Sequence, residues 1–146
     1  MSSKQQIEAT TTATSEECRY TWTINNYNLI KTEVGESISS PKFYVGSDNK
    51  QFFKLDLYPE GKESAGFISL FLTYEGTDST KKPDKLICKS TIYALKNMDI
   101  LSSCEIHQDF VKSPTGGPLE FFELKSKFKW MKNCNYFLQC KSSHGL

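Results

Sequence analysis

Cys104 and His107 are the one cysteine and histidine pair whose types and spacing could support nucleophilic chemistry, with an imidazole activating a thiolate. Both lie in a stretch around Glu105–Val111 that we predict to be a β-strand. Residues three apart on a strand point to opposite faces of the sheet, so the two groups should not share a proton. We therefore expect no catalytic residue in this pair.

Motifs of other enzyme classes are also missing from the sequence. There is no G-x-S-x-G nucleophile turn, no phosphate-binding G-x-x-x-x-G-K-[ST] and no zinc-binding H-E-x-x-H. Gly116 and Gly117 lack the third glycine and the following helix that a phosphate cradle needs. The acidic residues are scattered in the way expected of a solvated surface. We expect the protein not to be an enzyme and to carry no cofactor.

The five cysteines suggest reduced thiols in an intracellular protein of the nucleus or cytoplasm. Their number is odd, no signal peptide is visible, and no N-x-[ST] glycosylation site occurs. A zinc site would need paired ligands at short spacing, which are missing, so we expect no metal site. The more plausible role is that of small buried hydrophobic residues. The cysteines are Cys18, Cys88, Cys104, Cys134 and Cys140.

Length and charge restrict the possible partners. The chain has 146 residues, of which 38% are hydrophobic and 13% aromatic, so one domain can bury a core of ordinary size. Its 18 basic and 17 acidic residues leave a net charge of +1, which gives no electrostatic signature of nucleic-acid or membrane binding. No apolar run approaches the roughly 20 residues that span a bilayer.

Short strands separated by turn residues predict an all-β protein, and their spacing of about ten residues without long helices favours an antiparallel β-sandwich. We read residues 1–17 as a disordered N-terminal segment, 18–142 as the domain and 143–146 as a C-terminal tail. The predicted strands are Arg19–Asn25, Gln51–Tyr58, Phe67–Tyr74, Leu86–Leu95, Glu105–Val111 and Tyr136–Lys141.

Two segments could hold a helical turn or two, and one segment should hold neither helix nor strand. Lys96–Ser103 and Phe121–Lys127 are the candidates for helix. Ser113–Pro118 contains two prolines and two glycines, and we expect it to form neither a strand nor the interior of a helix.

Apolar residues on the outward side of several strands are the strongest sign of a binding surface. If Ile68, Leu70 and Leu72 face the core, Phe71 faces out, and the same alternation puts Ile87 outside. The Glu105–Val111 strand is harder to phase, but Gln108 and Phe110 share one face of it. Phe71, Ile87 and Phe110 could line a shallow groove for an extended peptide. The alternative is that a loop or the N-terminal segment covers them.

The segment Tyr20–Tyr27 resembles the first strand of MATH (meprin and TRAF homology) domains, most closely those of speckle-type POZ proteins and arthropod MATH-BTB proteins. The resemblance continues through Ser40 and Phe43, Phe53–Gly61 and Ile68–Leu72 to Tyr136–Cys140. It covers about residues 18–141. It implies an eight-stranded antiparallel, TRAF-like sandwich, in agreement with the strand pattern.

The resemblance also implies a function and a site. In the speckle-type POZ group the domain binds short Ser/Thr-rich degrons, and a following BTB domain dimerises and holds a cullin-3 ubiquitin ligase. The implied partners are therefore protein or peptide substrates, with no nucleic acid and no membrane. The implied peptide-binding residues are Phe71, Ile87, Gln108, Phe110, Gly116, Gly117 and Pro118.

The chain departs from the family in its groove and in its length. Gly116 and Pro118 stand where the family has a tryptophan and a phenylalanine, so we expect weaker binding of the family's usual degron. Gly117 keeps a glycine whose backbone could contact a peptide. No BTB domain follows within the 146 residues, so dimerisation and cullin recruitment would need a longer protein. The alternative function is a structural or oligomerising TRAF-like domain with a degenerate groove.

Overall fold

The computed structural model describes residues 14–46, 50–63, 65–78, 82–96, 99–123 and 133–144. The side chains of residues 14–18, 28, 96, 122–123 and 133–144 lie outside this description, as do residues 1–13 and 145–146 of the predicted terminal segments. The predicted inward side chains of Tyr136, Leu138 and Cys140 therefore stay predictions.

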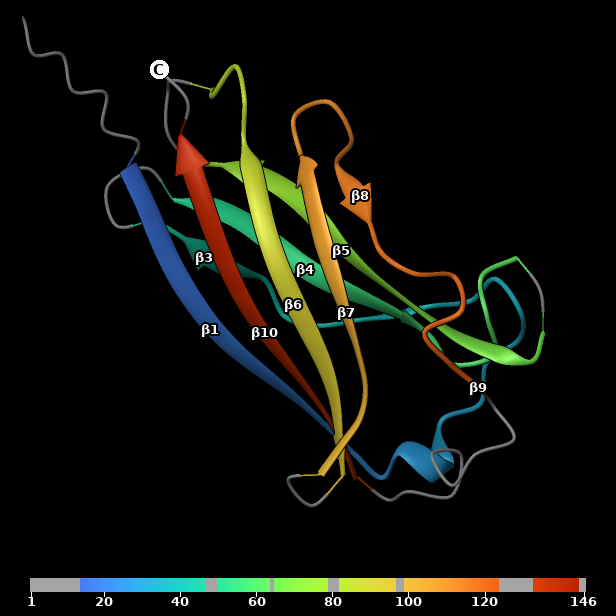
Figure 1. Ribbon diagram of the computed structural model, residues 1–146. Coiled ribbons are helices and arrows are strands. Elements are labelled where there is room, and N and C mark those ends of the chain that lie inside the picture. Colours follow the sequence, from blue (N-terminus) through green and yellow to red (C-terminus); the bar gives the residue numbers. More distant parts are fainter. Residues whose placement is uncertain are drawn as a thin grey trace, which may run out of the picture.

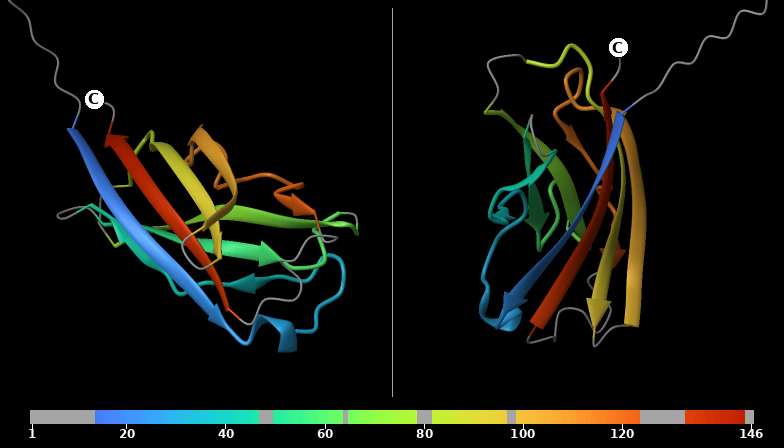
Figure 2. Two further views of the ribbon diagram at one scale, coloured as in Figure 1. Left: turned by 60° about the horizontal axis from the view of Figure 1, so that its bottom comes forward. Right: turned by 90° about the vertical axis from the view of Figure 1, so that its left-hand side faces the viewer.

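Two antiparallel sheets pack face to face, which confirms the predicted all-β sandwich (Figures 1 and 2). We call them sheet A and sheet B. Sheet A has the order β1-β10-β6-β7, and its strands are β1 (Thr14–Asn25), β10 (Asn133–His144), β6 (Ile87–Lys96) and β7 (Asp99–Asp109).

Sheet B has the order β2-β4-β5-β8, with β3 paired to β4 and β9 paired to β5. Its strands are β2 (Ile38–Ser39), β3 (Phe43–Val45), β4 (Gln51–Tyr58), β5 (Phe67–Thr77), β8 (Thr115–Gly116) and β9 (Phe122–Glu123). The described residues thus form ten strands rather than eight, and four of the ten are only two or three residues long. Sequence patterns did not reveal these four because each is too short to show an alternation.

The core lies between the sheets and follows the alternation of the strands. Buried and half-buried residues alternate strictly along β4, and the inward residues of β5 and β6 are fully buried. This confirms the predicted phasing of these strands. Burying one such aliphatic side chain stabilises the fold by about 1.5–3 kcal/mol. The largest fully buried side chains are Phe53, Phe110, Leu55, Leu57, Ile68, Leu70, Leu72, Leu86 and Ile92.

Strand boundaries differ from the predictions at three places. Strand β1 begins at Thr14, so residues 14–17 pair with residues 141–144 of β10 instead of being disordered. Strand β7 begins at Asp99, where a helical turn was expected, because Lys96 and Asp99 pair at the end of a β-hairpin. A two-residue strand, β8, forms within Ser113–Pro118, where we expected none.

Helix is scarce in the described residues. The 3-10 helix η1 (Tyr27–Leu29) follows β1, and Asn26 before it has a positive φ of 55°. No helix in the described part is long and apolar enough to cross a membrane. The predicted turns of helix at residues 124–127 lie outside the description, while Phe122 and Glu123 form β9.

Candidate functional site

The predicted groove residues Phe71 and Ile87 lie on different sheets. Phe71 is on β5 of sheet B, and Ile87 is on β6 of sheet A. Each has fully buried neighbours on both sides in the chain, so each points outward from its own sheet. The two side chains therefore face opposite sides of the sandwich, and the prediction that they line one groove is wrong.

Phe110 belongs to the core rather than to a surface. Its side chain is fully buried, and its ring meets that of Phe53 edge to face with centroids 5.3 Å apart. Its backbone N–H donates to the carbonyl O of Leu86 (2.8 Å), which joins the end of β7 to the start of β6. The face of β7 that holds Ile106 and Phe110 is the inner face, so the prediction of Phe110 as a surface anchor is wrong.

Phe71 faces outward but is covered by two side chains of its own sheet. Only 8% of the residue is exposed. The Tyr58 ring packs against it edge to face at 5.7 Å, and Lys62 Nζ lies over it, 4.4 Å from the ring centroid. Phe71 is not among the residues of the core cluster between the sheets. It is an outer-face aromatic residue covered by the side chains of Tyr58 and Lys62, whereas the alternative considered from the sequence was cover by a loop or the N-terminal segment.

Ser69 fixes the turn that carries Lys62. The Lys62 backbone N–H donates to Ser69 Oγ (3.1 Å), and Ser69 Oγ–H donates to the carbonyl O of Leu119 (2.6 Å). Ser69 is 1% exposed, so both bonds are shielded from water. This hydroxyl ties the turn after β4 to the segment after β8, and the two segments frame Phe71.

Strand β8 forms the free edge of sheet B beside Phe71. The N–H groups of Tyr74 and Leu70 donate to the carbonyl oxygens of Pro114 (2.7 Å) and Pro118 (3.2 Å). Gly116, midway between the prolines, pairs with Leu72 of β5. Because peptide groups alternate along an antiparallel strand, those of Thr115 and Gly117 point away from β5.

The prolines do not prevent this strand because they contribute only carbonyl groups to it. A proline lacks an N–H donor and is tolerated on an edge strand where no donor is required. The expectation that Ser113–Pro118 cannot form a strand overlooked this arrangement. Each proline carbonyl accepts one hydrogen bond from β5, and the segment is thereby held along the strand.

Gln108 bridges the edges of the two sheets. Its side chain starts on the inner face of β7, and Nε2 donates to the carbonyl oxygens of Ser113 (2.6 Å) and Thr115 (3.2 Å). A β-carbon at Gly116 would lie 2.1 Å from Gln108 Oε1. The glycine therefore provides the space that the Gln108 amide occupies.

Gly117 allows β8 to approach β5 closely. Its φ is 156°, and a β-carbon there would lie 2.1 Å from the carbonyl O of Leu70 and 2.9 Å from Cα of Phe71. Any larger residue would push the segment away from the sheet. Gln108, Gly116, Gly117 and Pro118 are thus brought together at one edge, with Phe71 beside it.

A row of polar side chains crosses the outer face of sheet B next to this edge. Ser39 Oγ and Thr73 Oγ1 each donate to one carboxylate oxygen of Asp56 (both 2.6 Å). Lys54 Nζ lies 3.0 Å from Glu75 Oε1 and 3.6 Å from Asp56 Oδ1. The hydrogen bond to Glu75, then the charge of Asp56, raise the pKa of Lys54. Both oxygens of Asp56 are occupied by structural bonds, which does not suit a catalytic base.

The sequence did not single out Lys62, Tyr58 or Asp56. Tyr58 and Asp56 alternate with core residues on β4 and therefore read as ordinary outward positions. Lys62 follows Gly61 in a turn, and no periodicity relates it to Phe71. The pairing of β4 with β5 sets Asp56 opposite Phe71 and brings Tyr58 to the aromatic ring, and the turn after β4 carries Lys62 over it.

The Cys104 and His107 pair has no arrangement suited to catalysis. Cys104 packs against the core, whereas His107 is exposed, which confirms that they face opposite sides of the sheet. Burial raises the pKa of the Cys104 thiol to about 11. Such a thiol is almost entirely protonated at neutral pH and is a poor nucleophile. Among the residues that the structure describes, no group of three or more His, Cys, Asp or Glu residues could hold a metal ion.

A small cavity of about 230 Å³ opens near the start of β8, where the far end of β5 meets the turns before β6 and after β7. Its volume is below the usual range for small-molecule sites. It is lined by Tyr74, Gly76, Thr77, Lys82, Pro83, Phe110, Val111 and Pro114.

The geometry at the edge of sheet B contains no reactive group, but it offers outward peptide groups, an aromatic ring and a cation. These are features of a surface that contacts another polypeptide. Comparison with known families agrees with this reading, since residues 19–140 match the family model of the MATH domain. The chain therefore belongs to the MATH-domain family of protein-interaction modules.

Proposed function

We propose that this domain binds a short peptide in an extended conformation along the free edge of β8. The observation that carries the proposal is the direction of the peptide groups of Thr115 and Gly117, which point away from β5. An added strand would pair with the Thr115 N–H and the backbone groups of Gly117, as in other complexes that extend a sheet, while the Thr115 carbonyl accepts from Gln108. This edge is short, its Thr115 is exposed while Gly116 is buried, and it lies beside an aromatic residue.

The residues of this proposed site have separate roles. Phe71 is the apolar anchor once Lys62 moves aside, and Gly117 supplies backbone hydrogen bonds. Gln108, in the space left by Gly116, donates to the Thr115 carbonyl and holds the edge in place for an incoming strand. Pro118 ends the pairing segment. Ile87 and Phe110 have no part in the site, because one lies on the opposite sheet and the other in the core.

From the resemblance to speckle-type POZ domains, we also propose the kind of ligand, the partners and the compartment of this protein. The ligands would be Ser/Thr-rich degrons of protein substrates, and a longer protein would add a BTB domain and cullin-3 binding. The protein would act in the nucleus or cytoplasm, and Cys104, whose thiol forms no disulfide, is compatible with a reducing compartment. No contact within the described residues specifies a degron sequence.

Replacement of Thr115 by proline tests the edge-pairing mode. Thr115→Pro removes an N–H group that points away from β5, and it leaves the hydrogen bonds of Pro114 and Pro118 to β5 in place. Thr115→Ala is the matched control, because it removes the side chain and keeps the N–H. Peptides would be selected from a random library on the wild-type domain, and their dissociation constants measured by fluorescence anisotropy.

We expect Thr115→Pro to weaken binding about tenfold through the lost hydrogen bond and the clash of the ring with the ligand strand. Thr115→Ala should bind within about twofold of wild type. Equal affinity of the proline variant would overturn edge pairing. A library that yields no ligand at all would remove the peptide-binding function, and light scattering would then test an oligomerising role.

A further inference from the structure

The aromatic pair Phe71 and Tyr58 already holds a cation. Lys62 Nζ lies 4.4 Å from the Phe71 centroid and 5.7 Å from that of Tyr58. The two rings meet edge to face, with an angle of 87° between their planes. One ammonium group therefore contacts both rings, and aromatic faces attract cations through their quadrupole.

Lys62 can leave this position without disturbing the fold. Its backbone N–H is anchored to Ser69 Oγ at 3.1 Å, so the turn stays in place when the side chain moves. The side chain is a flexible four-carbon stem that is only half-buried. A positively charged group from outside could take the same place over the rings.

The segments around the aromatic pair carry an excess of negative charge. Glu60 and Glu63 flank Lys62 in the chain. The Gly35 N–H donates to the Gly61 carbonyl (2.8 Å), which brings the Glu33–Glu36 loop alongside.

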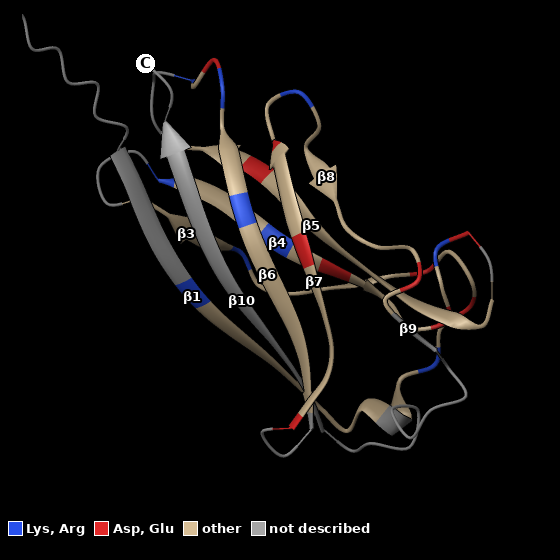
Figure 3. Ribbon diagram, viewed as in Figure 1, with Lys and Arg blue, Asp and Glu red and all other residues tan. Residues whose placement is uncertain are grey.

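Glu120 follows Leu119, whose carbonyl accepts a hydrogen bond from Ser69. Acidic residues gather on the loops at this end of sheet B in Figure 3. Residues 31–36, 60–63 and 119–120 hold five glutamates and two lysines, Lys31 and Lys62, so the local charge favours a cationic ligand.

We propose that Phe71 and Tyr58 form a subsite for a lysine or arginine side chain of the bound peptide, and that this side chain displaces Lys62. The subsite rests on the proposed peptide-binding function and specifies the charge of one ligand residue. Arginine suits it better than lysine, because the planar guanidinium stacks on aromatic rings and is more weakly hydrated. Lys62 is then an internal competitor that lowers the affinity for such peptides.

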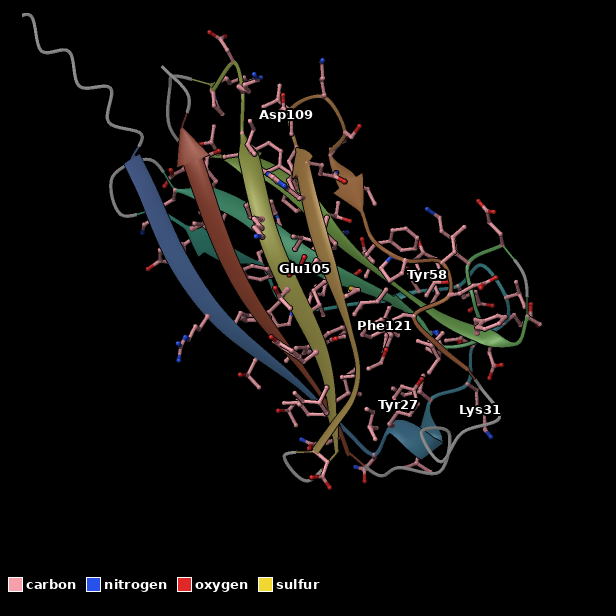
Figure 4. All side chains as sticks on the ribbon, in the orientation of Figure 1. Tyr27, Lys31, Tyr58, Glu105, Asp109 and Phe121 are labelled. Carbon is pink, nitrogen blue, oxygen red and sulfur yellow. The ribbon has the colours of Figure 1, made fainter. Side chains whose placement is uncertain are left out.

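Removal of the Lys62 charge gives the sharpest test. Lys62→Met keeps most of the apolar stem over Phe71 and removes the ammonium group. Lys31→Met, on the loop after η1 (Figure 4), is the matched control for the loss of one positive charge at this end of the molecule. A positional-scanning library of acetylated octapeptides would be screened on the wild-type domain and on both variants.

We expect the wild-type domain to enrich arginine or lysine at one position of the peptide. Lys62→Met should raise the affinity for the best basic peptide about threefold or more, and Lys31→Met should raise it less. Tyr58→Leu, which removes one ring of the subsite, should weaken binding and reduce the preference for a basic residue. Urea unfolding of each variant would show that the domain remains folded.

Three results would overturn the subsite. One is enrichment of acidic residues in the selected peptides, together with loss of peptide binding in Lys62→Met. The second is a set of ligands without basic preference and with equal affinity for all variants, which would leave the proposed function standing. The third is a failure of tetramethylammonium chloride to shift the Phe71 and Tyr58 ring signals of Lys62→Met in NMR, relative to sodium chloride. This last measurement needs no peptide, so it separates the subsite from the peptide-binding function.

Discussion

Phe71 and Phe110 show how two phenylalanines of similar sequence context differ in energetic role. Phe110 is fully buried against Phe53, whereas Phe71 lies on the outer face under Lys62 and Tyr58. We expect Phe110→Ala to lower the free energy of unfolding by about 3–5 kcal/mol, because it opens a cavity between the sheets. Phe71→Ala should lower it by only about 1–2 kcal/mol, because it removes an edge contact and a cation–π contact. Urea unfolding followed by tryptophan fluorescence measures both, and equal losses would contradict the assignment.

Cys104 should react slowly with thiol reagents at neutral pH. Its pKa is raised to about 11 by burial, so the reactive thiolate is roughly one part in ten thousand at pH 7. The rate of modification by a disulfide reagent, taken as the difference between wild type and Cys104→Ser, should be close to zero at pH 7. It should rise as the pH approaches 11. A fast Cys104-dependent phase at pH 7 would revive a catalytic role for this residue.

The alternation of residues along each strand predicted which side chains face the core, but it did not predict that Lys62 covers Phe71 on the outer face. Alternation assigned Ile68, Leu70 and Leu72 to the core, and all three are fully buried. It also put Phe71 outside, which is correct for the face. It gave no sign of Lys62, because a side chain that folds back from a turn has no fixed period relative to the strand it covers.

At the level of elements, β8 depends on a pair of residues from different strands. The Gln108 amide occupies the space over Gly116 and donates to the carbonyl oxygens of Ser113 and Thr115. Gly116→Ala should expel the amide and lower the free energy of unfolding by about 1–2 kcal/mol. Gln108→Ala should lower it by about 1 kcal/mol, since water can reach the released carbonyl groups.

The double variant distinguishes a coupled pair from two independent residues. Once Gln108 is absent, a methyl group at position 116 meets no amide, so the combined loss should be about 1 kcal/mol smaller than the sum of the single losses. Urea unfolding of the four proteins gives this coupling energy. Losses that add within about 0.5 kcal/mol would show that Gly116 is required for another reason.

Strand β8 could not be predicted because the residues of Ser113–Pro118 have low strand propensity. Two prolines and two glycines are poor strand formers, and the segment acquires its structure from β5, which donates hydrogen bonds to the proline carbonyls. The same is true of β7, whose first residues were expected to turn as a helix but pair with β6. In both segments, hydrogen bonding to the neighbouring strand outweighed the low local propensity for a strand.

The topology of the whole molecule explains why Phe71 and Ile87 do not line one groove. Strands β5 and β6 are neighbours in the chain, and the sequence placed their outward residues on one surface. The chain instead crosses from sheet B to sheet A between them, so Phe71 and Ile87 face opposite sides. Alternation gives the face of a residue within its sheet, but it contains no information on which sheet a strand joins. The fold class was therefore predictable, whereas the site required the topology.

Asp109 ties the end of β7 to the start of β6 within sheet A and should make the stability of the whole domain sensitive to acid. It lies at the end of β7 (Figure 4), and its Oδ1 accepts hydrogen bonds from the N–H groups of Leu86 (3.0 Å) and Val111 (3.1 Å). The hydrogen bond from Leu86, followed by weaker bonds from the next turn and the charge of Lys85, lowers the pKa of this carboxyl below its ordinary value of 3.8.

A folded-state pKa below that of the unfolded chain means that the carboxylate stabilises the domain at neutral pH. This contribution is lost as the pH falls through the lowered value. Asp109→Asn keeps the shape of the side chain and an oxygen acceptor but has no charge to lose. We expect the variant to be less stable than wild type at about pH 7 and the difference to shrink as the pH falls through the lowered pKa of Asp109, in urea unfolding at each pH. A difference that stays constant across this range would mean that the charge of Asp109 does not stabilise the junction between the end of β7 and the start of β6, and that its hydrogen bonds act through geometry alone.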